Sequence, residues 1–213
     1  MPIFFQQDID ECTKLAVWKI EEEENFFLSR VSLQREITHP HKRLQHLAGR
    51  YLLKYLFPDF PVSLIQIADT RKPYLEDEAY HFSISHCGDY AAVVASREKR
   101  VGVDIEIVTG KIDRIKNKFI SADEWPVVND GQLKEENPAA NSRLTLVWSC
   151  KEAVFKWYGQ GGVDFKEHMK VRQIIAVDKS SLKTIMSFQK QEVVFLHLHS
   201  AFFDELCLSY VCT

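Results

Sequence analysis

Apolar residues recur along this chain with helical spacing in three places. Over residues 41–57, leucine, alanine and tyrosine return every three or four positions, which predicts a helix with one face in the core. Residues 112–119 show a shorter pattern of the same kind. A third helix is predicted over residues 142–158, because Gly159 follows the periodic stretch and glycine commonly ends a helix.

Shorter apolar runs between polar or turn-forming residues predict strands. These runs cover residues 3–5, 15–20, 63–68, 81–85, 90–96, 101–108, 171–177, 184–188, 193–200 and 206–212. The last four are predicted to form an antiparallel meander. Ser121, followed three residues later by Glu124, resembles a capping box and predicts one more short helix. The polar segment 129–141 contains a glycine and a proline and is predicted to be a loop.

The order of these elements indicates two similar passes through helix and strand, without a repeat at the level of residues. The chain has 213 residues, of which 46% are hydrophobic, so it can bury a sizeable core as one large domain or two small halves. No low-complexity linker divides the passes. We therefore expect the two halves to pack against each other.

Composition and charge exclude several classes of protein. The net charge is −3, from 27 basic and 30 acidic side chains, so nothing indicates a nucleic-acid surface. The five cysteines are odd in number and lack CxxC spacing, which favours reduced thiols. No apolar stretch reaches the roughly 18 residues of a membrane span, and the first residues do not combine a basic region with a hydrophobic core, so we expect neither a span nor a signal peptide. We expect a cytoplasmic protein that binds neither membrane nor nucleic acid.

The segment Gly102-Val103-Asp104-Ile105-Glu106 carries candidate chemistry. Alternate residues of a strand share a face, so Asp104 and Glu106 can direct two carboxylates at one cation. Val103 and Ile105 would then pack on the opposite side. The pattern predicts a metal site at this strand.

A second cluster lies on the predicted helix 142–158. Trp148, Glu152 and Lys156 follow one another at i, i+4 spacing, which places a third carboxylate and an ammonium on one stripe. Trp148 is expected to be a packing residue that fixes the helix. Three acids beside lysines fit Mg²⁺, or Mn²⁺, together with the phosphates of a pyrophosphate.

Four segments in this order resemble the motifs of the 4′-phosphopantetheinyl transferases. They are Arg-Lys-Pro-Tyr-Leu at 71–75, Phe-Ser-Ile-Ser-His-Cys at 82–87, Gly-Val-Asp-Ile-Glu at 102–106 and Trp-x-x-Lys-Glu-Ala-x-x-Lys at 148–156. Their order and spacing are similar to those of the surfactin-synthetase-type branch. Arg71 stands where the family usually has glycine, Ser83 where it often has asparagine, and Cys87 where serine is frequent.

The resemblance implies a fold and a reaction. The fold would be α+β, with two pseudo-symmetric halves at 1–105 and 106–213, each with a small, mostly antiparallel sheet and packed helices, and an active site at their junction. The reaction would transfer the 4′-phosphopantetheine arm of coenzyme A to a serine of an apo acyl or peptidyl carrier protein. Adenosine 3′,5′-bisphosphate would be released, and the enzyme would act as a monomer with Mg²⁺.

The resemblance also implies roles for individual residues. The implied metal ligands are Asp104, Glu106 and Glu152, and the implied catalytic residues are Glu152, Lys156 and Asp104. The implied contacts to coenzyme A are Lys72, Ser85, His86, Lys151, Lys156, Arg43, His46 and Arg50, with Arg30 a weaker candidate for the 3′-phosphate.

Some of these roles stay open at the level of sequence. Glu152 could be a metal ligand or the general base that takes the serine proton. Lys151 could join Lys156 at the phosphates, but adjacent helix positions diverge by about 100°, so one of them could point elsewhere. Arg71 could be a solvated turn residue or could supplement the phosphate contacts.

Two other functions use the same residues. A metal-dependent phosphohydrolase could place three acids and two lysines around a pyrophosphate and would need no carrier protein. A non-catalytic carrier-protein or nucleotide-binding module is the other alternative. A Glu152→Gln variant would separate catalysis from binding alone.

Overall fold

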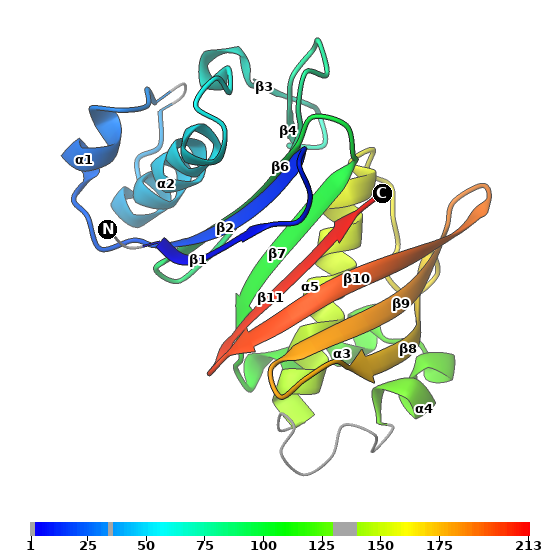
Figure 1. Cartoon of the computed structure of the whole chain (residues 1–213). Helices are drawn as coiled ribbons and strands as arrows, with labels where there is room; N and C mark the ends of the chain where they lie inside the picture. Colours follow the sequence, from blue (N-terminus) through cyan, green and yellow to red (C-terminus); the bar gives the residue numbers. More distant parts are fainter. Residues whose placement is uncertain (1–2, 34–35, 130–139) are drawn as a thin grey trace. The chain divides into compact units, whose positions relative to one another are not determined.

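A computed structural model describes residues 3–33, 36–129 and 140–213 of the chain. The chain forms two compact units, Met1–Val103 and Asp104–Thr213. The boundary predicted from the sequence lay two residues later, and the structure places Asp104 in the same unit as Glu106. Figure 1 shows the elements of both units.

The first unit contains a four-stranded antiparallel sheet with the order β1-β2-β6-β5 (Figure 1). Its strands are β1 (Ile3–Asp8), β2 (Thr13–Lys19), β5 (His81–Cys87) and β6 (Tyr90–Ser96). Other elements of the unit are α1 (Glu24–Leu28), α2 (Pro40–Leu56), the 3₁₀ turn η1 (Val62–Leu64), and the strands β3 (Gln66–Ile67) and β4 (Pro73–Tyr74) of a short hairpin. Helix α2 packs against β2 and β6, so its apolar face covers one side of the sheet.

Helix α2 owes its start and its position to particular residues. Pro40 occupies the first turn, where a missing N–H costs nothing, and the His39 side chain accepts a hydrogen bond from the Lys42 N–H. Near the middle, a Cβ atom at Gly49 would lie 2.7 Å from Cγ2 of Ile84 on β5. The absence of a side chain at Gly49 therefore lets the helix approach the sheet closely.

The second unit contains a five-stranded sheet with the order β7-β11-β10-β9-β8. Its strands are β7 (Val101–Ile107), which crosses the boundary between the units, β8 (Met169–Ala176), β9 (Ser181–Gln189), β10 (Val193–Phe203) and β11 (Leu206–Cys212). Its helices are α3 (Lys111–Phe119), the 3₁₀ turn η2 (Ala122–Glu124), α4 (Trp125–Val128) and α5 (Ala140–Tyr158). Helix α5 packs against β10 and β11 and lies on one face of the sheet (Figure 1).

Helix α5 is apolar around most of its circumference. Leu146, Val147, Cys150, Ala153 and Val154 are all fully buried. A helix of this composition is expected inside a unit and not on its surface. Two charged residues on it, Lys151 and Lys156, form ion pairs with acids of other elements.

The α+β fold is confirmed: both units combine helices with sheets whose described strand pairs are antiparallel. The three long helices and nearly all of the predicted strands are present. The predicted strand 63–68 is wrong in its first half, which forms η1 because Leu64 N–H bonds back to the Pro61 carbonyl; only Gln66–Ile67 is strand. Most of the predicted loop 129–141 lies outside the described residues. Within the described ranges, every helix is too short or too polar to span a lipid bilayer.

Candidate metal and phosphate site

Strand β7 presents two carboxylates in the second unit. Val103 and Ile105 are buried, as expected for the packed side of a strand. Asp104 is also buried, with 2% of its surface exposed, whereas Glu106 near the end of the strand is half-buried. A buried carboxylate is costly unless a partner compensates its charge. Helix α5 supplies that partner.

Lys156 of α5 bonds Asp104. Its Nζ atom donates a 2.6 Å hydrogen bond to Oδ1 of Asp104, and the two side chains form an ion pair. The Lys156 side chain is 24% exposed and that of Asp104 only 3%. The ammonium therefore neutralises a buried charge while remaining accessible from one side.

Trp148, two helical turns before Lys156, donates from its indole Nε1 to Oε1 of Glu106 at 3.3 Å. Its ring lies edge-on to Phe119, with ring centroids 5.2 Å apart, and tilted against Phe165 at 5.5 Å. The predicted packing role of Trp148 is confirmed by these contacts, and the hydrogen bond to Glu106 adds a polar one.

Glu152 lies one turn from each of these residues along the same stripe of α5. Together, its surroundings raise the pKa of its carboxyl group to about 7: burial is the main cause, Lys156 acts in the opposite direction, and the negative charges of Asp104 and Glu106 add to the rise. The structure thus brings Asp104, Glu106, Glu152 and Lys156 into one electrostatic environment.

The donor set suits a hard cation that keeps part of its water. Within the described ranges, no group of three or more histidine, cysteine, aspartate or glutamate side chains is already assembled as a metal site. Mg²⁺ commonly takes one or two carboxylates, several waters and substrate phosphates. The negative charges of Asp104 and Glu106 raise the pKa of Glu152, and a divalent cation would relieve that repulsion.

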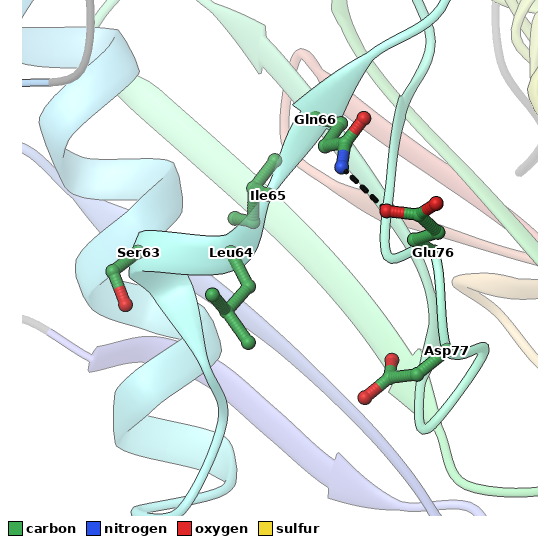
Figure 2. A pocket seen from close by; sticks show the side chains of 6 residues that line it. All are labelled: Ser63, Leu64, Ile65, Gln66, Glu76 and Asp77. Atoms are coloured by element: carbon green, nitrogen blue, oxygen red, sulfur yellow. Dashed lines mark hydrogen bonds between the residues drawn. The ribbon is translucent and has the colours of Figure 1, made fainter.

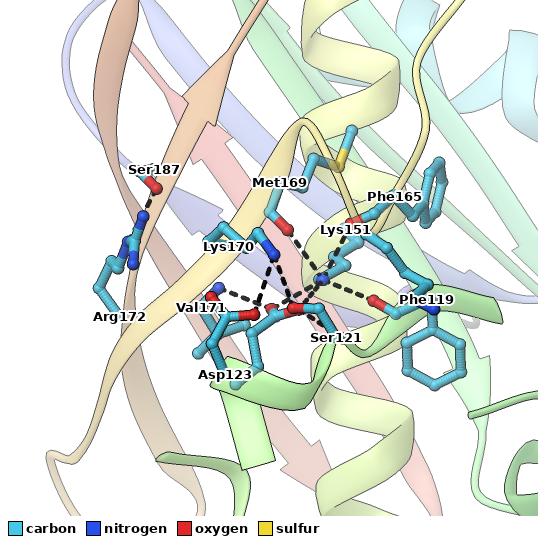
Figure 3. Close-up of polar contacts among 12 residues, drawn as sticks. Phe119, Ser121, Asp123, Lys151, Phe165, Met169, Lys170, Val171, Arg172 and Ser187 are labelled. Atoms are coloured by element: carbon cyan, nitrogen blue, oxygen red, sulfur yellow. Dashed lines mark hydrogen bonds and ion pairs between the residues drawn. The ribbon is translucent and has the colours of Figure 1, made fainter. Parts of the chain in front are cut away.

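Lys151 points elsewhere. Its side chain is fully buried, and Nζ forms a 2.7 Å ion pair with Glu124. The same ammonium donates to the carbonyl oxygens of Phe119, Phe165 and Met169, at 2.6, 3.0 and 2.9 Å (Figure 3). All donors of this ammonium are used inside the unit, so the structure places Lys151 apart from the stripe of Glu152 and Lys156.

The sequence predicted Glu124 as a helix cap but not as the partner of Lys151. Its carboxylate accepts from Ser121 N–H at 3.0 Å and from Val171 N–H at 2.8 Å, in addition to Lys151. The predicted capping box of Ser121 and Glu124 is confirmed. That motif was the available signal, but nothing in it indicated that the capping glutamate would also be the counter-ion of a buried lysine.

Lys72 is the most informative basic residue of the first unit. It is partly buried in the hairpin of β3 and β4, and burial, followed by the charge of Arg100, lowers the pKa of its ammonium to about 8. Arg71 beside it has a φ of 65°, a left-handed conformation that favours glycine. This backbone geometry accounts for the glycine usual at this position in the pattern that the chain resembles.

The other predicted coenzyme A contacts lie on α2 and β5. Arg43 forms a two-point ion pair with Glu24, with bonds of 2.8 and 2.7 Å. His46 and Arg50 are buried, and Nη1 of Arg50 lies 3.2 Å from Nδ1 of His46.

On β5, Ser85 is buried and His86 is exposed. Ser83, two residues earlier, accepts a 3.1 Å hydrogen bond from the Val103 N–H. The side chain that replaces the frequent asparagine therefore holds the start of the Gly-Val-Asp-Ile-Glu segment.

A separate open pocket of about 500 Å³ lies beside η1 and β3 in the first unit. Figure 2 shows its lining residues, which are Ser63, Leu64, Ile65, Gln66, Glu76 and Asp77. Among these residues, Nε2 of Gln66 donates a 3.0 Å hydrogen bond to Oε2 of Glu76. Its two carboxylates are unsuited to a pyrophosphate, and it contains none of the predicted site residues.

Comparison with known families agrees with the motifs. The family model described as the 4′-phosphopantetheinyl transferase superfamily matches residues 100–211, which is more than half of the chain. The chain therefore belongs to the 4′-phosphopantetheinyl transferase superfamily. The matched residues include β7 and α5, which carry Asp104, Glu106, Glu152 and Lys156. The surfactin-synthetase-type branch stays a prediction.

Curated relatives carry names of the same kind. Enterobactin synthase component D of Salmonella typhi is 35% identical over 118 residues, which cover 54% of this chain and 47% of that protein. The corresponding protein of Escherichia coli (strain K12) is 32% identical over 118 residues, covering 54% of each. The 4′-phosphopantetheinyl transferase AcpT of Salmonella typhi is 26% identical over 160 residues, covering 74% of this chain and 75% of the relative. The chain thus spans about half the length of the enterobactin synthase components that it matches.

Proposed function

We propose that this protein transfers the 4′-phosphopantetheine group of coenzyme A to a serine hydroxyl of an apo carrier protein, in a Mg²⁺-dependent reaction that releases adenosine 3′,5′-bisphosphate. One observation carries the proposal: in a member of this superfamily, the β7 carboxylates Asp104 and Glu106 share one environment with Glu152 and Lys156 of α5. That set combines ligands for a cation, an acceptor for a proton and a positive charge for a phosphate.

Asp104, Glu106 and Glu152 would hold the cation. A bound Mg²⁺ supplies neutralisation of the charge that develops on the pyrophosphate oxygens during phosphoryl transfer. Lys156 already carries its ammonium to this place, where it bonds Asp104 and is partly exposed. We propose that the same ammonium bonds a phosphate oxygen of coenzyme A.

Glu152 is the proposed general base. In the transfer, the serine oxygen forms a bond to the phosphorus that bears the pantetheine arm, and the bond from that phosphorus to adenosine 3′,5′-bisphosphate breaks. The serine proton passes to Glu152, directly or through a water. In the chain without a cation, burial and the neighbouring acids raise the pKa of Glu152 to about 7, which supports a role in proton uptake.

We propose that the first unit supplies contacts to the nucleotide end of coenzyme A. Lys72 and Arg100 influence each other electrostatically there, and two neighbouring cations raise the affinity of a surface for a phosphate group. Ser85 and His86 remain proposed contacts. Arg43 is already paired with Glu24, so a contact to coenzyme A would have to compete with that ion pair.

The free thiols described at all five cysteines fit a reducing compartment, so we propose a cytoplasmic enzyme.

The test is to quantify adenosine 3′,5′-bisphosphate by chromatography after incubation with coenzyme A and Mg²⁺, with and without an apo carrier protein. We expect release only when the carrier is present, in equal amount to the carrier modified. Release without a carrier would favour a metal-dependent phosphohydrolase. Binding of coenzyme A with no product under any condition, across acyl and peptidyl carriers, would favour a non-catalytic binding module.

A further inference from the structure

The two acids of β7 receive different donors from the same helix. Asp104 is bonded by a cation, the ammonium of Lys156, whereas Glu106 is bonded by a neutral donor, the indole N–H of Trp148. We propose that Trp148 is a positioning residue, which orients the Glu106 carboxylate for a divalent cation through its Nε1–H. The inference rests on the proposed function, because it assigns Glu106 to cation binding.

Trp148 is held firmly enough to act in this way. Phe119 at the end of α3 meets its ring edge-on, and Phe165, which follows α5, lies against it at a tilt. Contacts of this kind stabilise a pair of rings beyond the burial of their area. Because the ring is packed on two sides by different segments, the direction of its N–H is set by the fold.

The chemistry of the donor distinguishes Trp148 from Lys156. The indole nitrogen can only donate, and it carries no charge. It therefore restricts the rotation of the longer glutamate side chain without neutralising the negative charge that attracts a cation. Groups that orient a metal ligand in this way commonly change metal affinity by about 10–100-fold when they are removed.

The test measures Mn²⁺ affinity by electron paramagnetic resonance on the full chain without coenzyme A, comparing wild type with Trp148→Phe. Phenylalanine keeps an aromatic ring between Phe119 and Phe165 but has no N–H. The matched control is Trp157→Phe on the same helix, whose Nε1 donates to Oγ1 of Thr213 at 2.9 Å. We expect Trp148→Phe to weaken Mn²⁺ binding about tenfold, and the control to leave it unchanged.

A double-mutant cycle tests whether Trp148 acts through Glu106. In a Glu106→Gln background, the effect of Trp148→Phe should shrink to less than about twofold, because the interaction is already lost. Undiminished weakening in that background would overturn the proposal and indicate a general packing role. Unchanged Mn²⁺ affinity in Trp148→Phe alone would overturn it as well.

If Trp148→Phe does not fold, Phe165→Leu is the second test variant. It removes one of the rings that pack against Trp148 but leaves the indole N–H in place. We expect Phe165→Leu to weaken Mn²⁺ binding about threefold, and we expect this effect to be absent in a Glu106→Gln background. An unchanged Mn²⁺ affinity in Phe165→Leu would overturn the proposal. A wild type that binds Mn²⁺ but transfers nothing to a carrier would contradict the proposed function, while the affinity cycle would still decide the role of Trp148.

Discussion

The Nζ atom of Lys156 lies 2.6 Å from Oδ1 of Asp104, so helix α5 places a positive charge directly against the buried carboxylate of β7. The pair is asymmetric, because the lysine is partly exposed and the aspartate is enclosed. A phosphate that reaches this site would compete with Asp104 for the same ammonium. The lysine is therefore suited both to folding of the unit and to binding of an anion.

Removing Lys156 should affect stability and activity together. Lys156→Ala leaves the Asp104 carboxylate without its cation, and we expect a loss of about 2 kcal/mol in the free energy of unfolding. It should also lower kcat/KM for transfer by at least about 100-fold. Urea unfolding and initial rates check both effects. The control is Lys116→Ala, which removes an exposed pair with Asp113 and should cost less than about 1 kcal/mol. Equal losses in both variants would contradict the assignment.

Glu152 should make stability depend on pH in one direction. Its pKa is about 7 in the folded chain against 4.5 as the ordinary value, so the folded state binds more protons between these limits. The free energy of unfolding should therefore fall as pH rises from 4.5 to 7, by at most about 3 kcal/mol. In a chelator, Glu152→Gln should match wild type at pH 5 and exceed it at pH 8. A difference that is the same at both pH values would show that the Glu152 carboxyl is not the group responsible.

The lowered pKa of Lys72 predicts that coenzyme A binding depends on pH. With a pKa near 8, its ammonium loses its proton above that pH, and a phosphate then loses a positive partner. We expect KM for coenzyme A to rise between pH 7 and pH 9 in wild type. Lys72→Arg keeps its charge throughout this range, so its KM should stay flat. A parallel rise in Lys72→Arg would assign the pH dependence to another group.

Lys151 and Glu124 should behave as a structural pair. Lys151→Met leaves the Glu124 carboxylate buried without its counter-ion, and we expect a loss of about 3–5 kcal/mol in the free energy of unfolding. Adding Glu124→Gln should recover part of that loss, whereas Lys118→Ala on the exposed side of α3 should change little. If Lys151→Met is instead stable and has a raised KM for coenzyme A, the result would support the predicted role of Lys151 as a coenzyme A contact.

Arg71 offers a test of backbone strain. Its φ of 65° is unfavourable for a residue with a Cβ atom, so Arg71→Gly should raise the free energy of unfolding by about 0.5–1 kcal/mol. Arg71→Ala keeps the strain and should not. If Arg71 is only a solvated turn residue, as we expect, KM for coenzyme A stays unchanged in both variants. An equal rise of KM in both would show that its guanidinium supplements the phosphate contacts.

Each of the two stripes of candidate residues could be predicted because the geometry within a stripe is local. The two-residue period of a strand relates Asp104 to Glu106, and the helical spacing relates Trp148, Glu152 and Lys156, so each stripe follows from sequence alone. Neither period predicts that the two stripes meet, which is shown by the bonds of Lys156 to Asp104 and of Trp148 to Glu106.

The parts that could not be predicted depend on contacts between distant segments. The partner of Lys151 is 27 residues away in the chain, and three of its bonds are to carbonyl oxygens, which no side-chain pattern indicates. In the same way, the bond from Trp148 to Glu106 joins residues 42 positions apart. The left-handed backbone at Arg71 was hidden because the residue type argues against it.

The most direct measurement is the intact mass of a purified apo carrier protein after incubation with this chain, coenzyme A and Mg²⁺. The account predicts a mass increase of one phosphopantetheine arm that is abolished by a chelator, by Glu152→Gln and by replacing the acceptor serine with alanine. An unchanged carrier mass across a panel of acyl and peptidyl carriers, with wild-type protein folded and Mg²⁺ present, would contradict it.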